Sequence, residues 1–144
     1  MKIGFFLVRC SLIGLVAGLP ALASAQVAVI VAPNSSLASL TGDQVASIFL
    51  GKTSQLPNGK SAALADLPDT STAREQFYSK AAGKSASQVK AAWSRLTFSG
   101  KATPPRELPS AADVKKFVAG NPDAIGYIEK SAVDSSVKVV LVVD

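Results

Sequence analysis

Five consecutive apolar residues, Val27 to Val31 (VAVIV), constrain the fold of this chain more than any other feature. A run dominated by β-branched residues with no polar residue inside it predicts a strand buried on both faces, as in a parallel or mixed sheet. A second run, VKVVLVV from Val137 to Val143, predicts another strong strand near the end of the sequence. Such strands need helices to cover them.

Helical patterns alternate with these strands and with two weaker ones, SAALAD and AIGYI. Hydroxyl residues followed three positions later by Gln or Asp mark helix starts, and glycines mark helix ends. The expected helices run from Thr41 to Gly51, from about Ser71 to Gly83, from Ser85 or Ser87 onward, and from Ser110 to Gly120. The alternation predicts an α/β domain with a mixed sheet flanked by helices. The stretch FSGKATPPRELP between the last two helices is expected to be a loop.

The first 25 residues have the pattern of a secretory signal peptide. An apolar run from Ser11 to Leu22 is followed by the small residues Ala23-Ser24-Ala25, which predict cleavage before Gln26. A membrane anchor is the alternative, but Gly18 and Pro20 interrupt a run that is already too short to span a bilayer. We therefore expect a cleaved segment 1–25 and a single secreted domain, 26–144.

The catalytic and metal-binding repertoire of residues 26–144 is narrow. Cys10 is the only cysteine of the sequence, and there is no histidine. A thiol nucleophile, a disulfide and a Cys/His metal site are excluded, although a carboxylate metal site is not. An enzyme would need a Ser–Lys pair or paired carboxylates, and no acids or lysines show such a spacing. We expect no enzyme activity, no metal and no cofactor.

The charge of residues 26–144 is mildly positive, with 13 basic and 10 acidic side chains. This net charge of +3 suits a small anionic ligand or an acidic partner. The basic residues look spread along the chain and are not interleaved with aromatic residues, so we expect no nucleic-acid binding.

The stretch DLPDTSTAREQFY, from Asp66 to Tyr78, carries the strongest local indication of a ligand. A helix start presents unpaired N–H groups and partial positive charge, and Ser71, Thr72 and Arg74 would add hydroxyl and guanidinium donors for an anion. The alternative needs no ligand, because Thr72 and Glu75 have the spacing of a capping box.

Four separated segments resemble the periplasmic phosphate-binding receptors of ABC transporters and their small relatives. They are VAVIVAPNSSLASLTGDQVASIFLGK, DLPDTSTAREQFYSK, GKSASQVKAAWSRLTFSGKATPPRE, and VKKFVAGNPDAIGYIEKSAV with VKVVLV. Their order and spacing carry the resemblance, and together they cover nearly all of residues 26–144. The resemblance implies a single lobe of the periplasmic-binding-protein type, a location in the periplasm, and binding of phosphate or a similar oxyanion.

The resemblance also implies ligand-binding residues. The candidates are Ser71, Thr72 and Arg74 at the helix start, Ser35 and Ser36 in the loop after the first strand, and Arg106 in the PPRE loop. The sequence departs from the family pattern in two respects, since ALADLPD has no arginine and Thr72 stands where the receptors have glycine. One lobe also cannot enclose an anion, so binding is expected to be weak or to be completed by a second protein.

The protein partners expected from the resemblance are a membrane transporter or a sensor. A second hypothesis is a lobe that has lost its ligand and serves as an adaptor for a transporter, porin or sensor. An exposed apolar patch, or a homodimer formed through the face that a second lobe covers in the large receptors, would support the adaptor.

Overall fold

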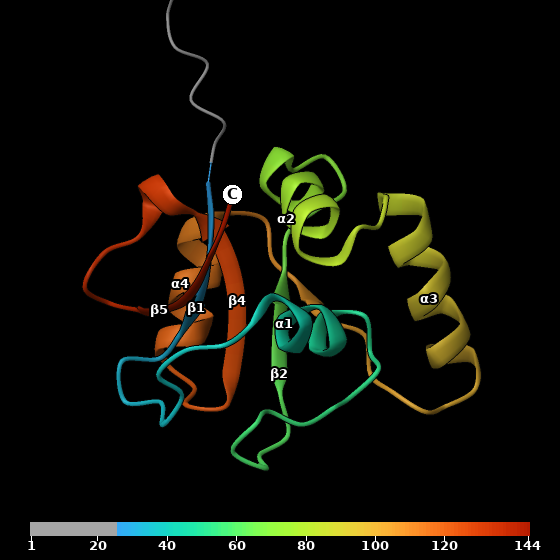
Figure 1. The fold of residues 1–144 in the computed structure, drawn as a ribbon, viewed down its shortest axis with the longest axis horizontal. Helices are drawn as coiled ribbons and strands as arrows, with labels where there is room; N and C mark the ends of the chain where they lie inside the picture. The colour runs from blue at the N-terminus through green and yellow to red at the C-terminus, as the bar shows by residue number, and fades with distance from the viewer. Residues whose placement is uncertain (1–25) are drawn as a thin grey trace, which may run out of the picture.

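The computed structural model describes residues 26–144, so the predicted signal peptide and its cleavage site lie outside the described residues. Five strands, four α-helices and one 3-10 turn follow one another along this part of the chain (Figure 1). Their bounds are β1 Val27–Val31, α1 Gly42–Phe49, β2 Ala63–Asp66, α2 Thr72–Ala82, α3 Ala86–Phe98, β3 Arg106–Glu107, α4 Ala111–Ala119, β4 Ala124–Glu129, η1 Lys130–Ala132 and β5 Lys138–Val143. The predicted α/β class with a mixed sheet flanked by helices is confirmed.

The five strands form one sheet in the order β3-β2-β4-β1-β5. Strand β2 is parallel to β3 and β4, whereas β1 is antiparallel to both of its neighbours, β4 and β5. Every residue of β1 is buried, as the VAVIV run predicted. Because β1 and β2 run in opposite directions, the loops that follow them leave the sheet at opposite ends.

Alternation along β4 shows which helices cover which face of the sheet. Gly126 faces α4, where an added Cβ atom would lie 2.8 Å from Val114 Cγ1 and 3.2 Å from Val118 Cγ2. The next residue, Tyr127, stacks on Phe77 of α2 at a centroid distance of 4.1 Å. Successive side chains of a strand point to opposite faces, so α4 covers one face while α1 and α2 cover the other. The lack of a side chain at Gly126 lets α4 lie close to β4.

Helix α3 stands apart from the sheet, beyond α1 and α2 (Figure 1). It is attached by Trp93, which is buried and donates its indole N–H to the carbonyl of Phe49 at 2.8 Å. Gly51, with φ 72°, makes the approach possible, because a Cβ atom there would overlap Leu96 and lie 3.1 Å from Trp93 Cη2. No helix within residues 26–144 is long and apolar enough to cross a membrane.

The helix caps explain why the helices begin where they do. Thr41 with Gln44 and Ser85 with Gln88 form the two predicted capping boxes. The predicted loop between α3 and α4 contains an unpredicted element, the two-residue strand β3, which pairs with β2 at the edge of the sheet. Two residues are too short for any periodic pattern, so only pairing with β2 defines this strand.

Candidate functional site

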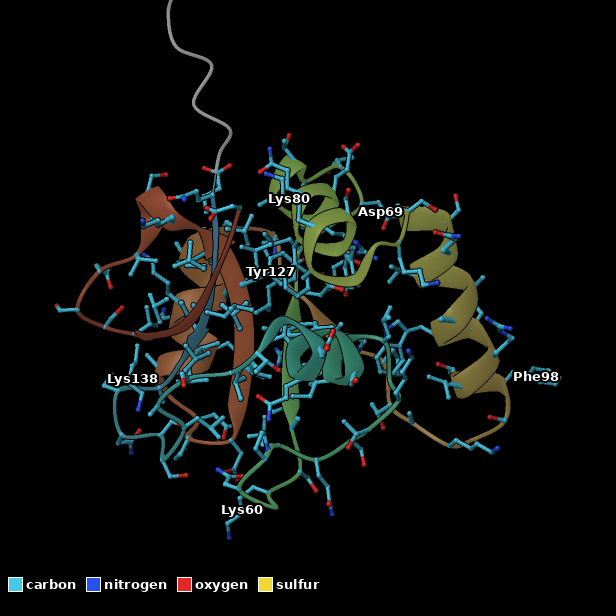
Figure 2. The ribbon with its side chains drawn as sticks, viewed as in Figure 1. Lys60, Asp69, Lys80, Phe98, Tyr127 and Lys138 are labelled. Carbon is cyan, nitrogen blue, oxygen red and sulfur yellow. The ribbon has the colours of Figure 1, made fainter. Side chains whose placement is uncertain are left out.

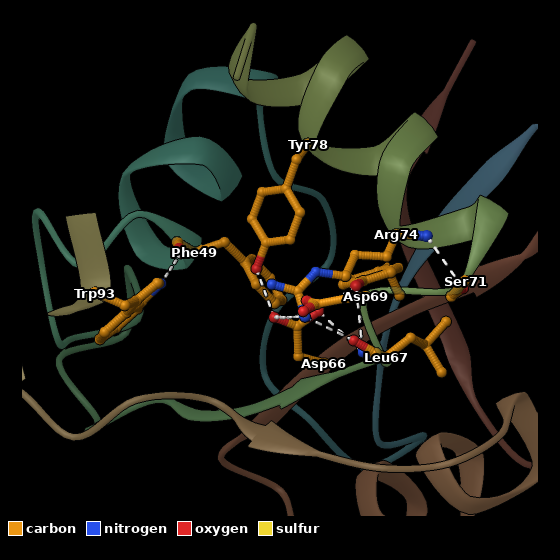
Figure 3. Close-up of polar contacts among 9 residues, drawn as sticks. Phe49, Asp66, Leu67, Asp69, Ser71, Arg74, Tyr78 and Trp93 are labelled. Atoms are coloured by element: carbon orange, nitrogen blue, oxygen red, sulfur yellow. Dashed lines mark hydrogen bonds and ion pairs between the residues drawn. The ribbon is translucent and has the colours of Figure 1, made fainter. Parts of the chain in front are cut away.

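Asp66, the last residue of β2, is the centre of a buried polar cluster at the start of α2 (Figure 3). Its carboxylate accepts hydrogen bonds from the hydroxyl of Tyr78 at 2.7 Å, from the hydroxyl of Tyr127, and from the Leu67 N–H at 2.9 Å. Only 5% of Asp66 is exposed. A buried carboxylate is stable only when such donors replace its water, so the cluster holds the end of β2 firmly against α2 and β4.

The two tyrosines of the cluster are held in their neutral form. Burial raises the pKa of both hydroxyls, and the negative charge of Asp66 raises each further because it opposes a second anion nearby. Neutral hydroxyls are the state that donates to a carboxylate. Tyr78 and Tyr127 therefore act as fixed donors over the whole physiological pH range.

Arg74, on the first turn of α2, supplies the positive charge of the cluster. Its Nη1 atom donates to the Leu67 carbonyl at 2.9 Å and forms ion pairs with Asp69 at 3.1 Å and Asp66 at 3.9 Å. Burial is the largest single influence and lowers the pKa of this guanidinium, but the acidic groups around it, Asp66 foremost, together outweigh burial and the pKa is raised. All of these contacts use Nη1, and Nε is buried with no partner within residues 26–144.

The start of α2 is capped by Ser71, whose Oγ accepts the Arg74 N–H at 3.3 Å. The alternative interpretation, a capping box of Thr72 and Glu75, is wrong. Thr72 already lies inside the helix, so the residue three positions after the cap is Arg74, which cannot accept the N–H of Ser71. Within residues 26–144, no acceptor takes the N–H of Thr72 or of Ala73.

A cleft of about 640 Å³ opens beside this cluster. The end of β2 and the start of α2 form one wall with Asp66, Asp69 and Arg74, and a face of α3 with Lys90 and Trp93 forms the other. The rest of the lining comes from Ser94, Thr97, Phe98, Pro104, Pro105 and Glu107. The cleft therefore presents cations and carboxylates together, and Arg74 lies where α2 begins.

The structure brings three of the six sequence candidates together and separates the others. Ser71, Thr72 and Arg74 lie together at the start of α2, Ser71 as its cap and the other two in its first turn. Ser35 and Ser36 follow β1 and thus lie at the opposite end of the sheet. Ser35 Oγ accepts the Leu37 N–H at 3.2 Å and Ser36 Oγ accepts from Asn58 at 3.0 Å.

Arg106 lies on the other face of the sheet from the cleft. Its guanidinium is 5.5 Å from the ring centroid of Phe117, which belongs to α4. The next residue, Glu107, faces the cleft, as strand alternation requires.

Sequence reasoning missed Asp66, Asp69, Tyr78 and Tyr127 as members of the site. The sequence held one indication, an acidic residue at the end of an otherwise apolar strand, which needs a partner if the strand is buried. Tyr127 comes from a segment 61 residues away, and only the pairing of β2 with β4 brings it to Asp66. In the described part of the chain, no group of three or more acidic, His or Cys side chains is arranged to hold a metal ion.

Comparisons with known proteins agree on one kind of protein. No family model matches the chain, and no curated protein matches it in sequence. The fold is similar to that of a phosphate ABC transporter substrate-binding protein from Clostridium perfringens, solved with bound phosphate, at a TM-score of 0.65 and 25% identity. It is also similar to an ABC-type phosphate transport receptor from Vibrio cholerae, at a TM-score of 0.63 and 22% identity.

Both similarities extend over 81% of this chain but over less than half of the other protein, 45% and 46% respectively. A third structure, PstS from Borrelia burgdorferi, shows the same relation with a TM-score of 0.57 and 47% of its own length covered. The shared part is the mixed sheet with its flanking helices. The described residues therefore have the fold of one lobe of a phosphate ABC transporter substrate-binding protein, and they are similar to such proteins over less than half of the length of those proteins.

Proposed function

We propose that this protein is an extracytoplasmic, one-lobed binding protein that takes phosphate or a similar oxyanion at the start of α2 and works with a membrane transporter or sensor. The observation that carries the proposal is the position of Arg74. It lies on the first turn of α2 beside two free backbone N–H groups, in a lobe whose fold is that of phosphate receptors. Binding without catalysis fits the same fold, since the similar proteins belong to transporters.

The chemistry of the site supports a non-covalently held anion. The N–H groups of Thr72 and Ala73 point out of the helix start, where partial positive charge favours an anion. The Ser71 hydroxyl accepts from the helix and keeps its own proton to donate. Arg74 uses only Nη1 for its protein contacts, which leaves Nη2 for a charge-assisted bond to the ligand.

Asp69 limits the affinity that we expect. Its side chain is 65% exposed and lies 3.1 Å from Arg74 Nη1, so it competes with an incoming anion for the guanidinium. Because Asp69 itself stays in contact with water, its pair with Arg74 contributes only on the order of 1 kcal/mol, and an anion can displace it. With one wall of the site open, phosphate binding in the high-micromolar to millimolar range is expected, on the order of 4–6 kcal/mol.

An adaptor that keeps the lobe without its ligand is the second candidate. The adaptor is favoured by the two ion pairs of Arg74, because Asp66 and Asp69 already neutralise its positive charge within the protein. In that case Asp66 and the capped start of α2 serve only to hold the fold.

Calorimetric titration of residues 26–144 with phosphate at low salt tests the proposal, and sulfate serves as the comparison anion. Ser71→Ala removes a donor from the site, and Ser110→Ala is a matched control. Ser110 caps α4 with the same 3.3 Å bond to a backbone N–H but lies outside the site. Each variant should lose about 1 kcal/mol of stability through its cap. Only Ser71→Ala should also weaken phosphate binding.

Asp69→Asn separates the two candidate functions. If an anion competes with Asp69 for Arg74, removing that carboxylate should tighten phosphate binding by about three- to fivefold. No saturable heat with the parent protein and with Asp69→Asn would leave the adaptor as the better account.

A further inference from the structure

The positive charge of this protein is concentrated in one segment, which corrects the expectation that basic residues are spread along the chain. Between Gln76 and Arg106 the sequence has six basic residues and no acidic one. The other described residues carry seven basic and ten acidic side chains. Helix α3 lies within this segment and stands away from the body of the molecule (Figure 1). The outlying helix is therefore a cationic element on an otherwise slightly acidic domain.

A groove of about 340 Å³ follows one flank of α3. Its lining includes Lys84, which precedes α3, Gln88 and Arg95 on the helix, and Lys52 from the turn after α1. Leu50, Ala91 and Ala92 supply the apolar part of the lining. Among the lining residues are three cations and no carboxylate.

No acidic side chain of the described protein pairs with any of the three cations. Lys52, Lys84 and Arg95 are all exposed, and none forms an ion pair with any residue from 26 to 144. Two of the basic residues that do form ion pairs, Arg74 and Lys115, pair with Asp69 and Asp134. Like charges gathered on one concave surface repel one another unless an anion lies between them. Such a surface attracts acidic partners and raises their association rate.

We propose that this groove binds an extended, acidic segment of a partner protein. Arg95 lies nine residues after Ala86, the first residue of α3, which at about 1.5 Å per residue is roughly 14 Å, and Lys84 precedes the helix. Carboxylates spread along this length can pair with all three cations at once. An extended peptide advances about 3.3 Å per residue, so roughly five residues reach from one end to the other. Gln88, also in the lining, has an amide that pairs with a peptide backbone.

A flat anionic membrane fits these observations less well than a peptide. The three cations line a hollow rather than a convex surface. Within residues 26–144, Phe98 is the one large apolar side chain that is strongly exposed, at 95%, and it points away from the end of α3 (Figure 2). A single phenylalanine supplies little of the apolar area that membrane anchoring requires.

The groove and the cleft beside Asp66 lie on different flanks of α3, although Lys84 also lines a hollow that reaches Asp69 and Arg74. Lys90, Trp93 and Ser94 line the cleft beside Asp66, whereas Gln88, Ala92 and Arg95 line the groove. At 3.6 residues per turn these two sets lie on different flanks of α3. The inference therefore does not rest on phosphate binding, and either can fail without the other.

Fluorescence anisotropy with a labelled peptide of six glutamates tests the groove, using residues 26–144, which contain the whole described fold and its core. The variant Lys52→Glu/Lys84→Glu/Arg95→Glu reverses the charge of the groove. The control Lys60→Glu/Lys80→Glu/Lys116→Glu makes the same change in net charge at exposed lysines outside it. We expect saturable binding that weakens with added salt. The groove variant should bind roughly tenfold more weakly or worse, and the control within about twofold of the parent.

Arg95 lies in the last turn of α3, where a cation favours the helix, so the groove variant could lose stability as well. The double variant Lys52→Glu/Lys84→Glu leaves Arg95 in place and should still lose most of the binding. Equal loss in the groove and control variants would overturn the proposal, because net charge alone would then explain the binding. Binding to phosphatidylglycerol vesicles without binding to the peptide would also overturn it in favour of a membrane surface.

Discussion

Raising the pH above 10 should unfold this protein in one cooperative step. The protein has two tyrosines in all, and both lie in the cluster around Asp66. An unfolded tyrosine has a pKa of 10.0, while burial and the Asp66 charge raise the pKa of Tyr78 and Tyr127 well above that value in the folded protein. Above pH 10 the unfolded chain therefore releases two protons that the folded protein retains. Their contribution to stability is complete below pH 10 and is lost as the pH rises beyond it.

The magnitude follows from the number of protons. For each proton that the unfolded chain releases and the folded protein keeps, the free energy of unfolding falls by about 1.36 kcal/mol per pH unit above 10. Two such protons lower it by about 2.7 kcal/mol per pH unit. A domain of this size has a free energy of unfolding of roughly 5–10 kcal/mol. Raising the pH by about two to four units above 10 should therefore reduce that free energy to zero. Tyr78→Phe leaves one tyrosine and should halve the slope, after an initial loss of about 1–3 kcal/mol because Asp66 loses a donor.

Tyrosinate absorbance and circular dichroism, recorded together against pH, give the measurement. Since no other tyrosine is present, the whole tyrosinate absorbance comes from this cluster. We expect both tyrosines to ionise in the same narrow interval in which the circular dichroism is lost. In guanidinium chloride they should titrate near pH 10 independently. Ionisation of either tyrosine near pH 10 with the fold intact would refute the account of the buried cluster.

Two substitutions test the packing around the sheet and α3. Gly126→Ala should destabilise the protein by about 1–3 kcal/mol, because the added methyl group would lie 2.8 Å from Val114 Cγ1. Gly42→Ala is the control, since no atom lies within 4 Å of its added Cβ, and chemical denaturation should show little loss. Trp93→Phe should cost about 1–3 kcal/mol, because the carbonyl of Phe49 loses its donor. Hydrogen exchange should then show faster opening of α3 than of β1, and uniform opening would contradict the view that Trp93 attaches this helix.

Local sequence patterns predicted most of the fold, because the interactions that fix those elements lie within a few residues. The capping boxes at Thr41 and Ser85 formed as expected, since a side chain three positions away suffices to satisfy the helix start. The run at Val27–Val31 became a fully buried strand for an equally local reason. At the start of α2 both Ser71 and Thr72 are suitable helix caps. The spacing of Thr72 to Glu75 favoured Thr72, but Ser71 is the cap in the structure.

The candidate site was only partly predictable. Ser71, Thr72 and Arg74 were named from the sequence and lie together, and whether they bind an anion stays a prediction. The residues that define their electrostatic surroundings come from other elements. Asp66 and Tyr127 meet through the pairing of β2 with β4, and no pattern within either segment indicates this contact.

The sequence by itself determined the class of fold, the helix starts, and the absence of thiol and imidazole chemistry from residues 26–144, because each depends on residue identity or short-range spacing. Only the tertiary structure decided what surrounds Arg74, how the candidate serines are divided between the two ends of the sheet, and where the positive charge gathers. Long-range strand pairing and the attachment of α3 through Trp93 place these groups. Electrostatic interactions depend on distance in space and on burial, and neither quantity is encoded in the order of residues along the chain.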